Sequence, residues 1–244
     1  GKALKSLPHS GYEKITQGRT ILLADCGHAP KYDYDQYAHA APLSFELSHG
    51  RDRVFVNCGT HPSNAEWKDL LRGTGAHNTV CLNYRNAFEI RRDGHFGRKA
   101  RIVSCDRQEN SEACLLDMAH DGYAPLNGVT HRRRLYMTEQ GGRLSGEDSL
   151  TCSIGLEREI DVAVRFHLHP RVLVSLTQGG NEALLRLPGG TGWRFFHNNG
   201  KLELEDSVYL GNGGKHKKTQ QLVIYGVMES DFAQIKWSLQ KESR

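Results

Sequence analysis

The chain has 244 residues, of which 38% are hydrophobic and 25% are charged, the ordinary balance of a globular protein. A mean hydropathy of -0.58 and the lack of any long apolar run exclude a membrane-spanning helix. The formal net charge is +4, and the Lys and Arg are scattered rather than interleaved with aromatic residues, which excludes a typical nucleic-acid-binding stripe. The mild positive charge suits a polyanionic partner, although on charge alone an ordinary solvated surface is the simpler interpretation.

Six cysteines are spread along the chain without a C-x-x-C pair: Cys26, Cys58, Cys81, Cys105, Cys114 and Cys152. Several stand in apolar, strand-like runs, which favours small buried hydrophobic residues over a disulfide framework. The beginning of the sequence lacks the apolar core of a signal peptide. We therefore expect either a mature product or a fragment of a longer protein.

Alternation of apolar and polar residues dominates the first third of the chain and predicts β-strands. The runs are residues 19–24, 43–48, 54–56 and 77–82, and the turn-like residues 49–52 join the second run to the third. Between the last two runs, one helix is predicted at residues 64–72. Ser63 or Asn64 would cap it, and Trp67, Leu70 and Leu71 would share one face.

The remaining two thirds of the chain continue the strand pattern, with Gly, Asn, Asp and Pro between the runs. Strands are predicted at residues 100–104, 113–118, 129–137, 143–150, 160–168, 172–176, 183–187, 193–196, 202–204, 221–227 and 235–239. Many short strands without a dividing linker indicate one all-β domain over residues 1–244. The predicted fold is a large antiparallel β-sandwich of several sheets with at most one or two short helices.

Two histidines stand where predicted strands begin. His39 precedes the strand at 43–48, His77 begins the strand at 77–82, and Asn57 follows the strand at 54–56. Two imidazoles and a third oxygen or nitrogen ligand from neighbouring strands would make a zinc-type site with an open position. Because these spacings are non-local, histidines satisfied by backbone hydrogen bonds remain the alternative.

Three further groups allow a chemical and a structural interpretation. In the strand at 160–168, alternation places Arg165, His167 and His169 on one face, which suits a metal or an anion but favours a structural polar layer. His120 and Tyr123 flank the turn-like Asp-Gly pair between them, and they could act as acid or base or merely pin the turn.

An arginine cluster gives the third group. His131 is followed by Arg132, Arg133 and Arg134, and these residues could bind a carboxylate because the arginine fork matches it in bidentate geometry. The sequence contains no Ser-His-Asp elbow, phosphate-binding glycine loop or dinucleotide fingerprint.

An ordered string of motifs covers most of the chain: Ala-His-Ala-Ala-Pro-Leu-Ser-Phe-Glu-Leu at 38–47, Val-Asn-Cys-Gly-Thr at 56–60, Trp67, Ala-His-Asn-Thr-Val at 76–80, His-Asp-Gly-Tyr at 120–123, Phe-His-Leu-His-Pro at 166–170 and Glu-Asp-Ser-Val-Tyr at 205–209. This string resembles the C-terminal β-sandwich domain of the heparinase II/III-like polysaccharide lyases. The resemblance implies a preceding helical toroid domain in the full enzyme and an acidic, uronate-containing polysaccharide as substrate. The implied reaction is β-elimination, and the implied location is the periplasm or cytoplasm of a bacterium. It also allows a homodimer.

The resemblance assigns roles to individual residues. His39 and His77 match histidines that ligate a structural zinc in some members, and Asn57 stands where the third ligand is typically an aspartate. The family pattern His-x-His-x-Asp reads here as Tyr37, His39 and Ala41, so Tyr37 replaces the candidate catalytic histidine. We therefore expect Tyr37 and His39 as catalytic residues and zinc at His39, Asn57 and His77. The expected substrate-binding residues are Asn78, His120 and Tyr123.

Three hypotheses follow from these residues. The leading one is a lyase fragment that forms one wall of a cleft and is incomplete as a catalyst alone. The second is a non-catalytic carbohydrate-binding module, which the departures at Tyr37, Ala41 and Asn57 favour. The third is a structural sandwich that supports a partner domain.

Overall fold

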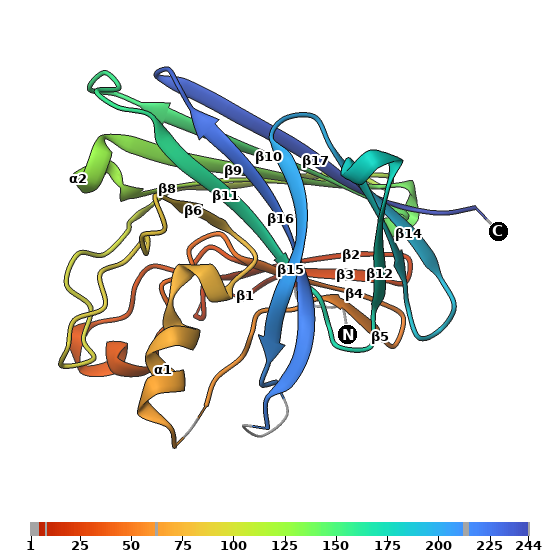
Figure 1. Ribbon diagram of the computed structural model, residues 1–244, viewed down its shortest axis with the longest axis horizontal. Coiled ribbons are helices and arrows are strands. Elements are labelled where there is room, and N and C mark those ends of the chain that lie inside the picture. Colours follow the sequence, from red (N-terminus) through yellow and green to blue (C-terminus); the bar gives the residue numbers. More distant parts are fainter. Residues whose placement is uncertain (1–4, 8, 62, 212–214, 244) are drawn as a thin grey trace.

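The computed structural model describes residues 5–7, 9–61, 63–211 and 215–243. It contains three antiparallel sheets that share one core (Figure 1). The predicted fold class is confirmed. In the described ranges, no helix combines the length and the apolar character needed to cross a membrane.

The first sheet has five strands in the order β1-β2-β3-β4-β5. These are β1 (Ser6–Leu7), β2 (Tyr12–Gln17), β3 (Thr20–Asp25), β4 (Phe45–His49) and β5 (Asp52–Phe55). Strand β2 was not predicted, because Ile15 is its only fully buried apolar residue. A single apolar position does not give the alternation of apolar and polar residues that predicts a strand. The predicted turn between β4 and β5 is confirmed, with Gly50 in the left-handed region at φ 63°, where glycine carries no Cβ penalty.

The second sheet has eight strands in the order β12-β13-β14-β17-β10-β9-β8-β7. They are β7 (Ile102–Glu109), β8 (Cys114–Tyr123), β9 (Val129–Thr138), β10 (Arg143–Cys152), β12 (Leu173–Thr177), β13 (Glu182–Arg186), β14 (Gly192–His197) and β17 (Phe232–Lys241). Burial alternates strictly along β9, as a sheet with one buried face requires.

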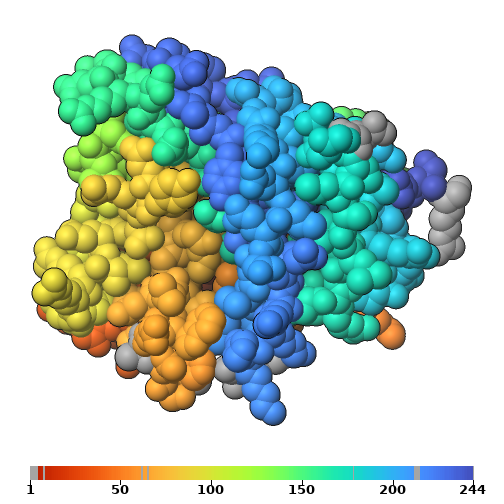
Figure 2. All heavy atoms as spheres, in the orientation of Figure 1, coloured from red at the N-terminus to blue at the C-terminus, as the bar shows by residue number. Residues whose placement is uncertain are grey.

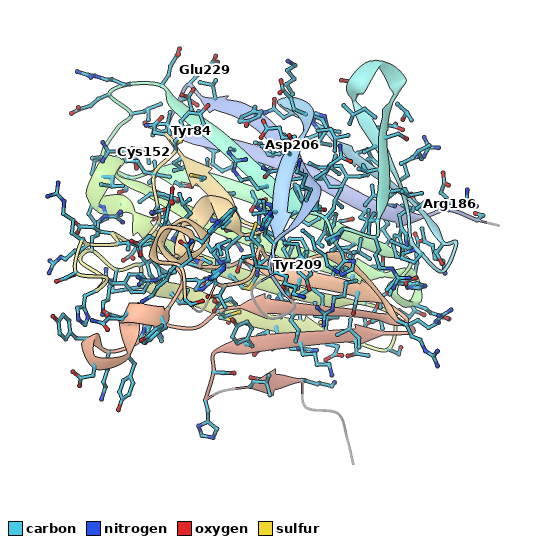
Figure 3. All side chains as sticks on the ribbon, turned by 60° about the horizontal axis from the view of Figure 1, so that its bottom comes forward. Tyr84, Cys152, Arg186, Asp206, Tyr209 and Glu229 are labelled. Carbon is cyan, nitrogen blue, oxygen red and sulfur yellow. The ribbon has the colours of Figure 1, made fainter. Side chains whose placement is uncertain are left out.

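The third sheet has four strands in the order β15-β16-β11-β6. They are β6 (Val80–Leu82), β11 (Ile160–His167), β15 (Lys201–Tyr209) and β16 (Lys217–Met228). In Figure 1, β15 and β16 are steeply inclined to β2, β3 and β4. The motif at 205–209 forms the end of β15, where Figure 3 labels Asp206 and Tyr209.

A cluster of aromatic rings joins the three sheets. Phe45 from β4 stacks on Trp237 from β17 with 5.6 Å between ring centroids, and Phe166 from β11 contacts the same indole at 4.7 Å. Gly146 in β10 is the cross-strand partner of Trp237, and a Cβ there would overlap the indole. The three sheets therefore bury their apolar faces in one continuous core, and each fully buried aromatic side chain stabilises it by about 1.5–3 kcal/mol.

Helices are few and short. The described helical segments are α1 (Ala65–Arg72), α2 (Ala124–Asn127), η1 (Tyr32–Tyr37), η2 (Thr74–Ala76), η3 (Glu139–Gly141) and η4 (Gln178–Gly180). The predicted helix corresponds to α1, and the Asn64 side chain caps it by accepting a hydrogen bond from the Trp67 backbone N–H at 3.1 Å. Within this helix Leu71 is buried, whereas the side chain of Leu70 is 64% exposed.

The helix and the loops around it cover one end of the sandwich. Figure 2 shows the segment that follows α1 packed beside β15 and β16, and the Trp67 ring stacks on His216 at 5.9 Å. These loops carry the motifs that contain His39, Asn57 and His77, so the fold brings them to the same end of the molecule.

Candidate functional site

A cavity of about 820 Å³ brings four of the predicted residues together. Tyr37, His39, Asn57 and His77 all line it, although they come from separate loops. Its other wall is formed by the segment after β3, which includes Cys26. A larger cavity of about 910 Å³ lies along β12, β13 and β14 and holds none of the predicted site residues.

Arg72, the last residue of α1, fixes the loop that carries His39. Its side chain is buried, with Nε donating to the Ala38 carbonyl at 2.7 Å and Nη2 donating to the Asp35 carbonyl at 2.8 Å. The backbone N–H of Ala40 in turn donates to the Arg72 carbonyl at 2.8 Å. The C-terminus of α1 thus holds the residues on both sides of His39.

The two histidines form a directed pair. Nδ1 of His77 lies 2.7 Å from the Gly73 carbonyl, which only accepts, so this nitrogen carries the proton. Nε2 of neutral His77 then accepts from Nδ1 of His39, at 2.8 Å. His39 is thereby held as the Nδ1–H tautomer, with a lone pair on Nε2. No residue in the described ranges hydrogen-bonds to that Nε2.

Both imidazoles are neutral near pH 7. Burial, aided by the charge of Arg72, lowers the pKa of His39 to about 4. Burial, aided by the neighbouring His39, lowers the pKa of His77 to about 3. His39 therefore offers an oriented, unprotonated nitrogen, which can accept a proton or a hydrogen bond from a group in the cavity.

Tyr37 lies at the rim of the cavity. Its side chain is 76% exposed, and the Nζ of Lys68 lies 4.2 Å from the centre of its ring. An exposed phenol beside an ammonium group can donate a hydrogen bond or a proton to a bound molecule and can stack against an apolar face.

Asn57 is already engaged. Its Oδ1 accepts from the Asn78 backbone N–H at 2.9 Å, and its own backbone N–H donates to Oε1 of Glu46 at 2.9 Å. Zinc needs ligands about 2.0–2.2 Å away, around a tetrahedral centre. Here the two imidazoles are hydrogen-bonded to one another. Among the described residues, no group of three His, Cys, Asp or Glu side chains is placed to hold a metal ion. This arrangement does not fit a zinc ion with three protein ligands.

Replacing Asn57 by Asp should therefore increase zinc binding. A carboxylate beside the histidine pair would supply the missing anionic ligand, so the Asn57→Asp variant should approach one zinc per chain while the parent stays well below it. Elemental analysis of the purified, tag-free protein measures this. The His39→Ala, His77→Ala variant is the control, and near-stoichiometric zinc in the parent that this control loses would contradict the expectation.

The three expected substrate-binding residues have internal partners. Asn78 is fully buried, and its side chain joins the Phe45 carbonyl to the His167 backbone N–H. The hydroxyl of Tyr123, also fully buried, donates to the Val80 carbonyl at 2.9 Å. His120 is equally buried and lies on β8 with Tyr123. None of the three lines the cavity, so we leave them out of the proposed site.

His167 fits the structural interpretation. It is buried, with Nε2 lying 2.9 Å from the Gly75 carbonyl and Nδ1 lying 2.7 Å from Oγ of Ser207. Phe166 and Leu168 point into the core as the alternation predicts. This histidine connects β11 to the loop before His77 and to the β15 motif, and so supports the site from behind.

The arginine cluster binds a carboxylate that belongs to the chain itself. Arg133 is fully buried, and its Nε and Nη2 donate to the Asp148 carboxylate at 2.7 and 3.0 Å. Nε2 of His131 donates to the same carboxylate at 2.7 Å. The Trp237 indole N–H donates to it at 3.0 Å. Arg132 instead pairs with Asp117 on the exposed face.

Asp25 is a cavity residue that the sequence analysis missed. It ends β3 and lines the same cavity as His39, and burial raises the pKa of its carboxyl to about 6. The signal was available, because Asp25 follows a predicted strand in the same way as Asn57. An acidic residue at a strand end is common in turns, however, and the sequence does not show which turns share a cavity.

Similarity to known proteins shows the family of this chain. The family model described as heparinase II/III-like, C-terminal, matches residues 1–238. FtsZ-localized protein C of Caulobacter vibrioides is 31% identical over 263 residues, which is 98% of this chain and 44% of that protein.

Solved structures share the fold. A mutant of heparan sulfate lyase HepC from Pedobacter heparinus superposes with a TM-score of 0.81 and 14% identity, covering 100% of this chain and 37% of that one. A heparinase III superposes with a TM-score of 0.77 and 13% identity, covering 100% and 36%. The chain thus spans less than half the length of these relatives. With the motif string, the sandwich and the family match over nearly all its residues, this chain belongs to the heparinase II/III-like C-terminal domain family.

Proposed function

We propose that this chain forms one wall of a cleft for a uronate-containing polysaccharide, and that His39 acts there as the base of a β-elimination. The observation that carries the proposal is the oriented histidine pair, which presents Nε2 of neutral His39 beside an 820 Å³ cavity. The relatives are more than twice as long as this chain, so the remaining groups of the site would come from a preceding helical domain.

The reaction needs a base and an acid on one sugar unit. The base removes the proton on the carbon next to the uronate carboxylate, and the electron pair forms a C=C bond as the glycosidic C–O bond breaks. The departing oxygen then needs a proton. A phenol O–H can donate that proton, and Tyr37 lines the rim of the cavity. The positively charged Lys68 beside Tyr37 would favour the substrate's carboxylate.

Replacing His39 by Gln should lower the elimination rate of the complete protein by about 100-fold or more, because a positioned general base contributes about 10²–10⁴. Ultraviolet absorbance of the unsaturated product measures the rate on a panel of uronate polymers. His197→Gln in β14, outside this cavity, is the matched control. Undiminished activity in the His39→Gln variant would exclude His39 as the base. Full activity of this chain alone would contradict the proposal that another domain supplies part of the site.

A second candidate is a non-catalytic carbohydrate-binding module in a protein that localises with FtsZ. The 31% identity to FtsZ-localized protein C over 98% of this chain favours it, as does the engaged Asn57. Calorimetry with oligouronates, together with imaging of a fluorescent fusion beside labelled FtsZ, separates the candidates. Binding without turnover and midcell co-localisation would favour the module, and turnover would favour the lyase.

A further inference from the structure

Three sulfur-containing residues, two in strands and one in the loop after β3, lie close together beside the candidate cavity. Cys26 follows β3, and its Sγ lies 3.1 Å from Sδ of Met118 in β8. Met118 is the cross-strand partner of Cys105 in β7. Directly opposed residues of an antiparallel pair project to the same face with their Cβ atoms about 4.5–5.5 Å apart. Cys26 and Cys105 therefore converge on the same thioether.

Strand β7, which carries Cys105, lies against the five-stranded sheet, whose strand β3 ends just before Cys26. Arg107 is two residues beyond Cys105 and so shares its face. Its Nη1 donates to Oε2 of Glu13 at 3.1 Å and to the Lys14 carbonyl at 2.9 Å, both in β2. The backbone N–H of Cys26 donates to the Gly11 carbonyl at 2.8 Å. These contacts keep β7, the edge strand of the eight-stranded sheet, next to the five-stranded sheet.

The two thiols differ in ionisation and in exposure. Cys105 is exposed and Cys26 is partly buried, whereas the other four cysteines are buried. The neighbouring thiol of Cys26 lowers the pKa of Cys105, and the neighbouring thiol of Cys105 raises the pKa of Cys26. Cys105 is therefore the nucleophile, because it is the exposed thiol that peroxide can reach and its thiolate is the reactive form. An accessible, low-pKa cysteine next to a second thiol is the arrangement of cysteines that sense oxidation.

We propose that Cys26 and Cys105 form a reversible disulfide when the protein meets hydrogen peroxide. The Cys105 thiolate attacks one peroxide oxygen, the O–O bond breaks, and the leaving hydroxide takes a proton to become water. The resulting sulfenic acid is attacked by the Cys26 sulfur. The S–S bond forms, the S–O bond breaks, and the Cys26 proton leaves with the hydroxide as a second water. Two electrons pass from the thiols to the peroxide, and a dithiol reductant returns them.

The bond would tie one wall of the candidate cavity to the eight-stranded sheet. Cys26 lines that cavity, whereas Cys105 belongs to an edge strand, so oxidation fixes the loop after β3 against β7. This inference does not depend on any lyase activity, because the chemistry uses only the two cysteines.

Mass spectrometry of the purified protein after hydrogen peroxide and thiol alkylation tests the proposal. The expected result is the loss of two hydrogens and two alkylatable thiols per chain, with the Cys26 and Cys105 peptides linked and released again by dithiothreitol. The Cys105→Ser and Cys26→Ser variants should each lose the link. Cys81→Ser, which removes a buried cysteine elsewhere, should keep it.

Other outcomes would overturn the proposal. They are a Cys105 that advances to sulfinic acid with Cys26 still free, a link between any other pair of cysteines, or no loss of thiols. The measurement on the parent protein does not depend on how the variants fold. Cys105 is exposed, and circular dichroism verifies that its serine variant folds.

Discussion

Lowering the pH from 7 to 5 should destabilise this protein by several kcal/mol. Burial lowers the pKa of His39 and His167 to about 4 and that of His77 to about 3, whereas an unfolded chain has a histidine pKa of about 6.5. The unfolded state therefore binds more protons below pH 6.5, and stability falls as the pH falls towards the folded pKa values. At pH 5 each of these histidines lowers the free energy of unfolding by about 2 kcal/mol. The total free energy of unfolding of a typical protein is about 5–15 kcal/mol.

Other groups adjust this acid dependence without reversing it. His120 and His131 are fully buried, and burial also lowers their pKa values, which adds to the loss. Asp25 has the opposite effect, because the pKa of its carboxyl is about 6 in the folded state and the folded state therefore binds its proton more tightly. Between pH 7 and pH 5 this adds about 1 kcal/mol to the free energy of unfolding. The net effect remains a loss of stability in acid.

Urea unfolding, repeated at intervals of about half a pH unit from about pH 7.5 to about pH 4.5, would measure the effect. This range covers the pH values over which histidines in the unfolded chain become protonated. The unfolding free energy of the His39→Gln variant should depend less steeply on pH, because about one proton fewer is bound on unfolding. The variant His216→Gln, which changes an exposed histidine, should show the same pH dependence as the parent. An unfolding free energy that stays level between pH 7 and 5 would show that these histidines are protonated or hydrated in the folded protein.

Replacing Asp148 by Ala should cost about 3–5 kcal/mol, because it leaves a buried charge without its partner. Arg133, His131 and Trp237 all donate to this one carboxylate. Burial by itself would raise the pKa of Asp148, but the charge of Arg133 and the hydrogen bond from His131 lower it well below its usual range. The carboxylate therefore stays ionised, and its removal strands the guanidinium in the core.

Arg132, the neighbour of Arg133 on β9, offers a matched control through its pair with Asp117 on β8. Asp117→Ala breaks the pair with Arg132, whose side chain is 56% exposed, and exposed pairs contribute only about 0–1 kcal/mol. Unfolding free energies from denaturant titration compare the two variants. Equal losses, or a loss below about 1 kcal/mol for Asp148→Ala, would contradict the assignment of a dry, tightly paired carboxylate.

The Asp148 network also explains part of the histidine content. Nδ1 of His120 accepts from the Gly122 backbone N–H, so its Nε2 donates to Nδ1 of His131, and Nε2 of His131 donates to Asp148. Both imidazoles are thereby fixed as neutral tautomers between the sheets. His120, expected from the sequence to contact substrate, is instead a link in the polar interior.

Local sequence determined the fold class, most strands and the position of α1. Alternation at period two is a property of neighbouring residues, and burial of one sheet face imposes it directly. It failed at β2, where a single buried Ile15 gives no period. In α1, helix periodicity did not show that Leu71 is buried while Leu70 is exposed. The placement of His39 and His77 at strand entries was also local, and the shared cavity agrees with it.

Tertiary structure alone decided which polar groups are free to act. Asn57 had an oxygen suitable for a metal, but the Asn78 backbone occupies it. The arginine cluster had the geometry for a carboxylate, and Asp148 from the next strand fills it. Cys26 and Cys105 lie 79 positions apart, and both lie beside Met118 because β7 packs against the first sheet. A side chain's chemistry is set by its own atoms, but its availability depends on partners distant in sequence, and a single sequence does not specify those pairings.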